Sequence, residues 1–528
     1  MQRIRYTLIL AVIFSFPLFL FAQKPNWQNM DLQTDSVFGI STEKAYQQLI
    51  KENHKKVQPV LVAVIDGGID TAHEDLKAVL WTNPKEIAGN KKDDDHNGYV
   101  DDLHGWNFLG SSRGNVNHEN LELVRLIRKL QPLYGNQTDS TVKGTDRVSY
   151  EAYKKMMKEY MTAYEKASGI LANIRMFDSA LTHLTTNMGK ENPTLTDFRE
   201  YKPKNEAEQR MVQVMEGILE KEPDFKQFKS EQVEEGLKYY GAEIDYHLNL
   251  NLNARAIVGD DSTNDKEHNY GNADVTGPDA DHGTHVAGII GAVRTNNIGI
   301  KGVADHVLLM SVRTVPDGDE RDKDVANAIR YAADNGAKVI NMSFGKAYSW
   351  DKKVVDDAVK YAISKDVLLV HAAGNDGKDL AKEKNYPNQT YEDGSGVAQA
   401  WIEVGASGWK DDETLVAPFS NYSKTSVDVF APGESIYSTT PGNKYANHDG
   451  TSMASPVVAG LAALIRTYYP KLTAIQVKDI IMKSVVKINH TIKIKVGEEE
   501  KTVPFSDVCI SGGIVNAYNA LLLAQKYK

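Results

Sequence analysis

Residues 60–68 read VLVAVIDGG, a run of six apolar residues that ends in an aspartate and two glycines. A short apolar run bounded by turn residues is typical of a β-strand that is covered on both faces, as in a parallel sheet. Similar runs recur along the chain, at 307–313, 338–344, 367–373 and 401–407. We therefore expect a sheet built from several buried strands.

Amphipathic segments separate these runs. In the segment 322–337, DKDVANAIRYAADNGA, apolar residues recur at helical spacing and Gly336 ends the pattern. Strands that alternate with helices form a parallel sheet with helices on its two sides. The sequence therefore predicts an α/β fold, mainly a parallel sheet with helices on both faces, in which ligands bind at the carboxyl ends of the strands.

One long stretch, residues 115–246, breaks this alternation because it contains no strand-like apolar run. Its segment 149–184 places Tyr, Met and Ile residues at helical spacing instead, and further amphipathic stretches follow. We interpret 115–246 as a helical insertion into a single α/β domain that is formed by residues 23–114 and 247–528.

The N-terminus has the layout of a secretory signal peptide. Two arginines precede an apolar run over 8–21, and Ala22 stands before polar sequence. An uncleaved anchor is the alternative, but the run is short for a membrane span. We expect residues 1–22 to be cleaved and the protein to be exported, periplasmic or extracellular, without stable membrane insertion.

The charge argues against nucleic-acid binding, and the cysteine content excludes an intramolecular disulfide. The net charge of −10 argues against a nucleic-acid partner, because phosphate binding relies on clustered Lys and Arg. Cys509 is the only cysteine, so no intramolecular disulfide can form. Stability outside the cell must then come from packing or from metal ions. Nothing in the composition indicates an oligomeric state.

Three residues with catalytic potential lie in separate segments. Asp66 ends the first apolar run, His282 lies in 281-DHGTHVAGIIGAV-293, and Ser452 lies in 449-DGTSMASPVVAGLAAL-464. Each alone has an ordinary structural interpretation: a turn cap, a buried imidazole and a helix N-cap. His282 and His285 could also form half of a metal site, although no matching Glu or Cys signature accompanies them.

Together the three segments resemble the active-site signatures of the subtilisin-like serine proteases, the subtilases, in the Asp, His, Ser order of that family. The resemblance covers about residues 55–110 and 250–520. It implies a subtilisin-like fold with Ser452 as the nucleophile and His282 as the general base and then acid. Asp66 would orient the imidazole.

Two further stretches extend the resemblance. The run 370-VHAAGNDG-377 resembles the family's Ala-Ala-Gly-Asn stretch, which implies that Asn375 donates a hydrogen bond in the oxyanion hole. His371 stands where the family usually has a small apolar residue. The substrate-binding edge, where an extended peptide adds as a strand, is matched by Ser343, Phe344 and Gly345. The ordinary alternatives are a simple turn at Asn375 and a plain strand end at Ser343–Gly345.

A calcium loop is predicted in 93-DDDHNGYVDDLHGW-106, where oxygen-bearing residues alternate up to a glycine. The twelfth place holds His104 rather than Glu, which argues against a complete EF-hand. A solvated acidic turn is the alternative. We predict a structural Ca²⁺ site formed by Asp93, Asp95, Asn97, Tyr99 and Asp101.

The sequence as a whole predicts an exported serine endopeptidase that hydrolyses proteins or peptides through an Asp-His-Ser triad and an acyl-enzyme intermediate. The alternative from another class is a catalytically silent binding scaffold with the insertion as its interaction module. Loss of any one of Asp66, His282, Asn375 or Ser452 would favour that scaffold, and all four are present.

Overall fold

The computed structural model describes residues 25–50, 57–497 and 499–527, so the predicted signal peptide 1–22 lies outside the described residues. A nine-stranded sheet forms the centre, in the order β12-β15-β9-β8-β7-β6-β1-β5-β2. Neighbouring strands run parallel, except β12 and β15, which are antiparallel. The strands are β1 (Val60–Asp66), β2 (Gly105–Asn107), β5 (Val307–Arg313), β6 (Val339–Met342), β7 (Leu368–Ala372), β8 (Trp401–Ser407), β9 (Val429–Pro432), β12 (Val486–Lys487) and β15 (Gly513–Ile514).

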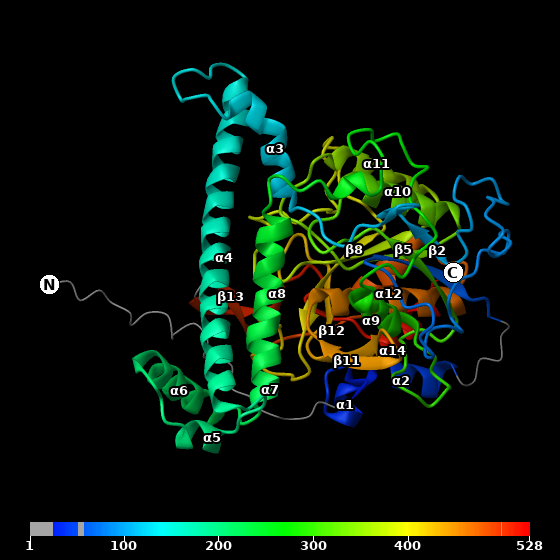
Figure 1. Cartoon of the computed structure of the whole chain (residues 1–528). Coiled ribbons are helices and arrows are strands. Elements are labelled where there is room, and N and C mark those ends of the chain that lie inside the picture. Colours follow the sequence, from blue (N-terminus) through cyan, green and yellow to red (C-terminus); the bar gives the residue numbers. More distant parts are fainter. Residues whose placement is uncertain (1–24, 51–56, 498, 528) are drawn as a thin grey trace.

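Helices cover both faces of this sheet (Figure 1). Since side chains of a strand alternate between faces, β1 packs Val62 and Val64 into one core cluster and Ala63 and Ile65 into another. The first cluster contains residues of α9 (Asp281–Gly291) and α12 (Thr451–Tyr468), and the second contains residues of α10 (Asp322–Asp334) and α11 (Lys352–Ser364). This arrangement explains the continuous apolar run of β1 and confirms the predicted α/β fold.

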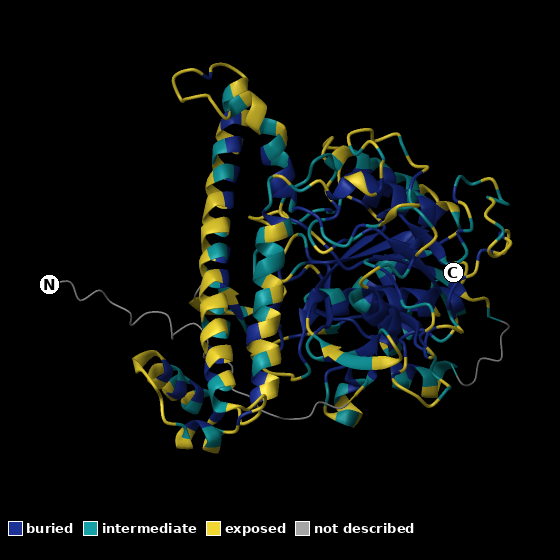
Figure 2. Cartoon of the chain, in the orientation of Figure 1, coloured by how far each residue is buried: buried dark blue, intermediate teal, exposed yellow. Residues whose placement is uncertain are grey.

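The sheet is buried and the helical region is mostly exposed (Figure 2). Between β4 (Gly114–Asn115) and α9 the chain forms a series of helices that stand beside the α/β body (Figure 1). They are α3 (Glu122–Tyr134), α4 (Asp146–Met188), α5 (Leu195–Glu200), α6 (Glu206–Leu219), α7 (Phe225–Phe228) and α8 (Glu235–Ala242), with π-helical turns at Lys229–Glu234 and Glu243–His247. We propose that these helices form the insertion, with boundaries 115–246.

Two separate apolar clusters hold the helical region together. One joins α3 to the first half of α4 through residues such as Val124, Ile127 and Tyr153. The other joins the end of α4 to the small helices α5 to α7 through residues such as Leu184 and Phe198. Among the apolar residues at helical spacing in 149–184, Tyr153 and Tyr160 are buried and serve packing, whereas Tyr164 is exposed.

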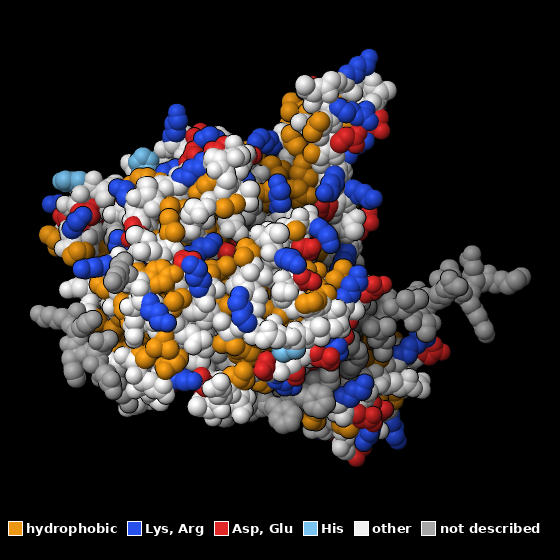
Figure 3. All heavy atoms as spheres, turned by 180° about the vertical axis from the view of Figure 1, so that it is seen from behind, with side chains coloured by type: hydrophobic (Ala, Val, Ile, Leu, Met, Phe, Trp, Pro, Cys, Tyr) orange, Lys and Arg blue, Asp and Glu red, His pale blue; other side chains and the backbone are white. Residues whose placement is uncertain are grey.

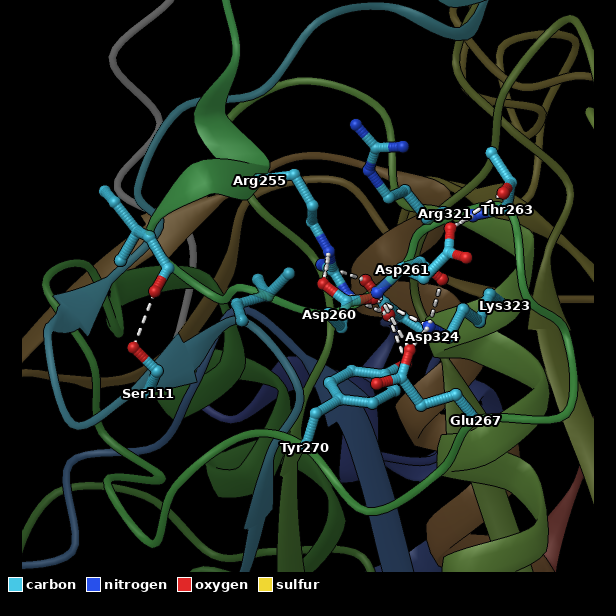
Figure 4. Close-up of polar contacts among 12 residues, drawn as sticks. Ser111, Arg255, Asp260, Asp261, Thr263, Glu267, Tyr270, Arg321, Lys323 and Asp324 are labelled. Atoms are coloured by element: carbon cyan, nitrogen blue, oxygen red, sulfur yellow. Dashed lines mark hydrogen bonds and ion pairs between the residues drawn. The ribbon is translucent and has the colours of Figure 1, made fainter.

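The chain returns from the helical region to the body through a buried network of charges (Figure 4). Arg255 is paired with Asp260 and with Asp324 of α10, and Lys323 contacts Asp260 at 2.7 Å. The Tyr270 hydroxyl donates to the Asp324 carboxylate. Because charges are retained in the interior only when they are paired, this network fixes the returning segment on the first turn of α10.

The face of the molecule seen from behind shows no concentrated charge of one sign. Seen from behind, Lys and Arg side chains are interspersed with Asp and Glu, and apolar side chains lie between them (Figure 3). A nucleic-acid site would require clustered positive charge, which this face does not present. Within the described ranges, no helix is long and apolar enough to cross a membrane.

Candidate active site

Asp66 and His282 meet at the carboxyl edge of the sheet, where β1 ends and α9 begins. Nδ1 of His282 lies 2.8 Å from Oδ1 and 3.0 Å from Oδ2 of Asp66. Since a carboxylate only accepts, Nδ1 carries the proton and Nε2 is left to accept one. The Asp66 side chain is 2% exposed and that of His282 is 44% exposed, so the buried carboxylate orients a ring that solvent or substrate can reach.

The glycine after His282 makes this contact possible. A Cβ on Gly283 would lie 2.1 Å from the carbonyl oxygen of Gly68 and 3.1 Å from Oδ1 of Asp66. Any side chain there would push the first turn of α9 away from the end of β1. The small residue in the sequence motif therefore has a packing function that sets the distance between His282 and Asp66.

The charge around His282 changes its pKa. Burial disfavours the imidazolium, but the carboxylate of Asp66, through its charge and its hydrogen bond, outweighs this cost and raises the pKa of His282. The more distant charges of Asp281 and Asp279 act in the same direction. His282 is thus tuned to hold a proton more firmly than a free imidazole, as suits a group that takes and returns a proton.

Ser452 lies in the first turn of α12, which packs against α9. Gly450 precedes this helix with a φ of 150°, a conformation that side chains rarely adopt. The Ser452 hydroxyl donates to the carbonyl of Ser343 at 3.1 Å. Within the described ranges no hydrogen bond joins it to His282, and catalytic hydrogen bonds are often long until substrate binds.

Pro456 frees the Ser452 carbonyl, because proline has no N–H to donate to the residue four positions earlier. The hydroxyl of Ser343 takes that place and donates to the Ser452 carbonyl at 2.9 Å. Asn341 donates to the same hydroxyl at 3.0 Å, and Ser455 lies 2.9 Å from it. This buried polar cluster joins the end of β6 to the start of α12 and holds the backbone of Ser452.

Sequence reasoning missed Asn341 and Ser455. The available signal was a polar residue inside an otherwise apolar strand and another inside an apolar helix. Such residues need partners when they are buried, but their positions in the sequence do not identify those partners.

Asn375 faces the same helix start. Its Oδ1 accepts from the backbone N–H and from the hydroxyl of Thr451, each at 2.9 Å. Because an N–H group can only donate, the carboxamide oxygen must face Thr451 and the Nδ2 group must face away. A Cβ on Gly450 would lie 3.5 Å from Nδ2, so this donor lies beside the residues that lead into Ser452.

The predicted substrate-binding segment, Ser343, Phe344 and Gly345, follows β6 directly. Gly345 lies against the Asn385 carboxamide, since a Cβ on Gly345 would lie 2.6 Å from Nδ2. The ring of Phe344 is edge-on to His371 at 6.3 Å. His371 is fully buried, and its Nδ1 lies 2.9 Å from Oε1 of Glu403. A buried polar pair therefore supports the segment from behind.

The model of the subtilase family matches residues 58–502 of the chain. The chain belongs to the subtilase family. Its mainly parallel sheet with helices on both faces and the order of its Asp, His and Ser segments agree with this membership.

Three named relatives are similar to this subtilase. It is 42% identical to the thermophilic serine proteinase of Bacillus sp. (strain AK1) over 212 residues. The aligned residues make up 40% of this chain and 48% of the relative. Subtilisin BL of Lederbergia lenta is 35% identical over 251 residues, 47% of this chain and 82% of the relative. Thermitase of Thermoactinomyces vulgaris is 42% identical over 185 residues, 35% of this chain and 60% of the relative. The chain thus spans about half the length of the first relative.

His285 of this subtilase is a structural residue rather than half of a metal site. It is fully buried, its Nε2 lies 3.1 Å from the carbonyl of Ala446, and its ring stacks on His448 at 4.1 Å. Burial and the neighbouring His448 lower the pKa of His285 to about 3. In the part of the chain that the structure describes, neither His282 nor His285 belongs to a group of three metal-binding side chains.

The acidic loop of the subtilase presents a candidate metal centre. Carboxylate oxygens of Glu86, Asp93 and Asp95 lie within 4.8 Å of one another. Oε2 of Glu86 is buried without a hydrogen-bond partner, whereas its Oε1 accepts from the backbone of Asp94 and Asp95. A hard cation would satisfy that orphaned oxygen, so the donor set fits Ca²⁺. Sequence reasoning missed Glu86 because it precedes the loop motif.

The other predicted ligands hold the loop itself. Oδ1 of Asn97 accepts from the backbone N–H of Tyr99 at 2.8 Å, and Oδ2 of Asp101 accepts from the backbone N–H of Lys91 at 2.8 Å. The Tyr99 ring is buried against Trp106, with ring centroids 5.1 Å apart. These contacts fix the loop on the body of the subtilase.

The Asp66 and His282 pair predicts a pH effect. Asp66→Asn should lower kcat/KM about 10⁴-fold, the size that such a change has in serine proteases, because an amide stabilises the wrong imidazole tautomer. A neutral imidazole acting as the base would make activity fall as pH drops through the pKa of His282. Removing the carboxylate that raises this pKa should move the fall to lower pH.

The measurement is kcat/KM for a chromogenic peptide over a wide pH range. Asp279→Asn is the matched control, because it removes a more distant charge and should shift the profile slightly with little loss of rate. If activity of Asp66→Asn falls at the same pH as that of the wild-type protein, the pairing of Asp66 with His282 is contradicted.

Proposed function

We propose that this subtilase is an exported endopeptidase that hydrolyses peptide bonds of proteins or peptides through Asp66, His282 and Ser452. The observation that carries the proposal is the hydrogen bond between Asp66 and Nδ1 of His282, which leaves Nε2 of an exposed ring as the base. Family membership and the partly exposed position of Ser452 in the first turn of α12 support it. The predicted signal peptide supports export.

The proposed reaction proceeds in two halves. Ser452 Oγ attacks the scissile carbonyl while His282 Nε2 takes the hydroxyl proton, and His282 then gives this proton to the leaving amine. A water molecule attacks the acyl-serine ester, again with His282 as base, and the carboxylic acid and the free serine are released. Asp66 accepts the hydrogen bond from Nδ1 of His282 and stabilises the imidazolium in both halves.

The oxyanion of each tetrahedral intermediate requires donors that are already in place. We propose that Nδ2 of Asn375 is one of them, because Thr451 fixes the carboxamide with this group directed away. The N-terminus of α12 supplies a favourable dipole at the same position. Ser343, Phe344 and Gly345 would bind the substrate backbone as an added strand.

The proposal predicts that Ser452→Ala abolishes peptide cleavage by the purified protein, since the only change is the loss of the attacking oxygen. Cleavage is measured with a quenched peptide library, which also reports the side-chain preference. Ser168→Ala, which removes a hydroxyl from α4, is the control and should retain full activity. Undiminished cleavage by Ser452→Ala would refute the proposed nucleophile.

We also propose a structural Ca²⁺ ion bound by Glu86, Asp93 and Asp95, with the Asn97 and Tyr99 turn closing the loop. Three carboxylates this close repel each other in the absence of a cation. A cation there would stabilise the folded chain, which has no disulfide to do so.

Calcium removal should therefore lower stability. At Ca²⁺ about 100-fold above the Kd, an ion bound only by the folded state adds about 2.7 kcal/mol, so EDTA should lower the melting temperature measurably. Glu86→Gln should melt lower in calcium and respond less to EDTA. Asp94→Asn, a change in the same loop outside the carboxylate group, should keep the full EDTA response. A wild-type melting curve that EDTA leaves unchanged would exclude the site.

A further inference from the structure

The segment that follows Gly345 is attached to the helical region at every second residue. Lys346 Nζ lies 2.6 Å from Oε2 of Glu122 in α3. The hydroxyl of Tyr348 donates to Glu159 of α4 at 2.7 Å. The ring of Trp350 lies 4.0 Å below the ammonium group of Lys129 in α3. Three successive contacts therefore link the residues next to the predicted substrate-binding segment to the first two helices of the insertion.

Lys346 is the innermost of these contacts. Its side chain is 0% exposed, and besides Glu122 its Nζ contacts Oδ1 of Asp322 and the carbonyl of Glu320, each at 2.7 Å. An ammonium group has three donors, and these three acceptors use all of them. A buried charge that is paired so completely has one position, because any displacement leaves it without partners in a medium of low dielectric constant.

Glu122 is held as firmly on the other side. Arg125 donates to both of its carboxylate oxygens, at 3.1 Å and 2.8 Å. Arg125 also donates to the carbonyls of Asn120, Asp319 and Glu320, so the first turn of α3 is fixed to the loop before α10. The ammonium group of Lys346, together with Arg125, overcomes the effect of burial and lowers the pKa of Glu122 to about 2.

Lys346 also fixes the backbone beside the segment Ser343–Gly345. Its N–H donates to the carbonyl of Tyr386, and its carbonyl accepts from the N–H of Tyr386, each at 2.9 Å. Tyr386 follows Asn385, whose carboxamide lies against Gly345. The buried side chain of Lys346 and its backbone pairing with Tyr386 therefore hold the residue that directly follows Gly345.

We propose that Glu122 and Lys346 are positioning residues for peptide binding: through their buried ion pair the helical insertion holds the segment Ser343–Gly345 in place to bind an extended substrate. This inference rests on the proposed function. An extended peptide binds this edge by main-chain hydrogen bonds, which depend steeply on distance and angle. A small displacement of the segment would therefore weaken peptide binding while Asp66, His282 and Ser452 stay in place.

Glu122→Gln and Lys346→Met test the proposal. Each should raise KM for an extended peptide about tenfold and leave kcat within about twofold, because uniform binding is lost and the chemical step is not. Both should react with a fluorophosphonate at the wild-type rate, since this small reagent needs only the activated serine. Lys346→Met leaves Glu122 paired with Arg125, so this variant is expected to fold even if Glu122→Gln does not.

Asp260→Asn is the matched control. Asp260 is a buried carboxylate that bridges an arginine and a lysine, Arg255 and Lys323, as Glu122 bridges Arg125 and Lys346. It does not contact the segment after Gly345, so it should lower the melting temperature without raising KM. An unchanged KM in folded Lys346→Met, or an equal rise in Asp260→Asn, would overturn the positioning role. A wild-type protein that neither cleaves peptides nor reacts with the fluorophosphonate would overturn the proposed function, and this inference with it.

Discussion

The hydrogen bond between Asp66 and His282 joins residues that are 216 positions apart, and it depends on the placement of several elements of the fold. β1 must end at the edge where α9 begins, and α9 must approach without a side chain at Gly283. The sheet must be covered on both faces to fix β1, which explains why its residues are apolar on both sides. The whole helical region lies in the chain between Asp66 and His282. The chain must therefore leave the α/β body after β1 and come back to it before α9.

The apolar runs were sufficient to predict the fold. The runs at 60–65 and 307–313 form neighbouring parallel strands, and a strand buried on both faces has a nearly continuous apolar sequence. The candidate triad was predictable because its residues lie in motifs with a fixed order. Polar contacts across the fold were not predictable. Glu122 and Lys346 are 224 positions apart, and only the tertiary structure pairs a charge in a helix with a charge after a strand.

The charges at the start of α10 show how the body and the helical region are connected. Asp322 contacts Lys346, and two residues later Asp324 contacts Arg255. One helical turn therefore holds both the segment beside the predicted substrate edge and the chain that returns from the insertion. Figure 4 shows the second of these contacts, between Asp324 and Arg255. Buried ion pairs add little net stability compared with apolar packing, but they define one arrangement of the partners. Here that arrangement fixes the insertion relative to the predicted substrate-binding segment.

Asp66, His282 and Ser452 come from distant segments of the chain, and together they are proposed to form one activated serine. The most direct measurement is fluorophosphonate labelling of the purified, folded protein, followed by peptide mapping of the modified residue. The account predicts one modification per chain, at Ser452, with a rate that falls as His282 becomes protonated at low pH. Labelling that is absent, or that is spread over other serines in the folded protein, would contradict it.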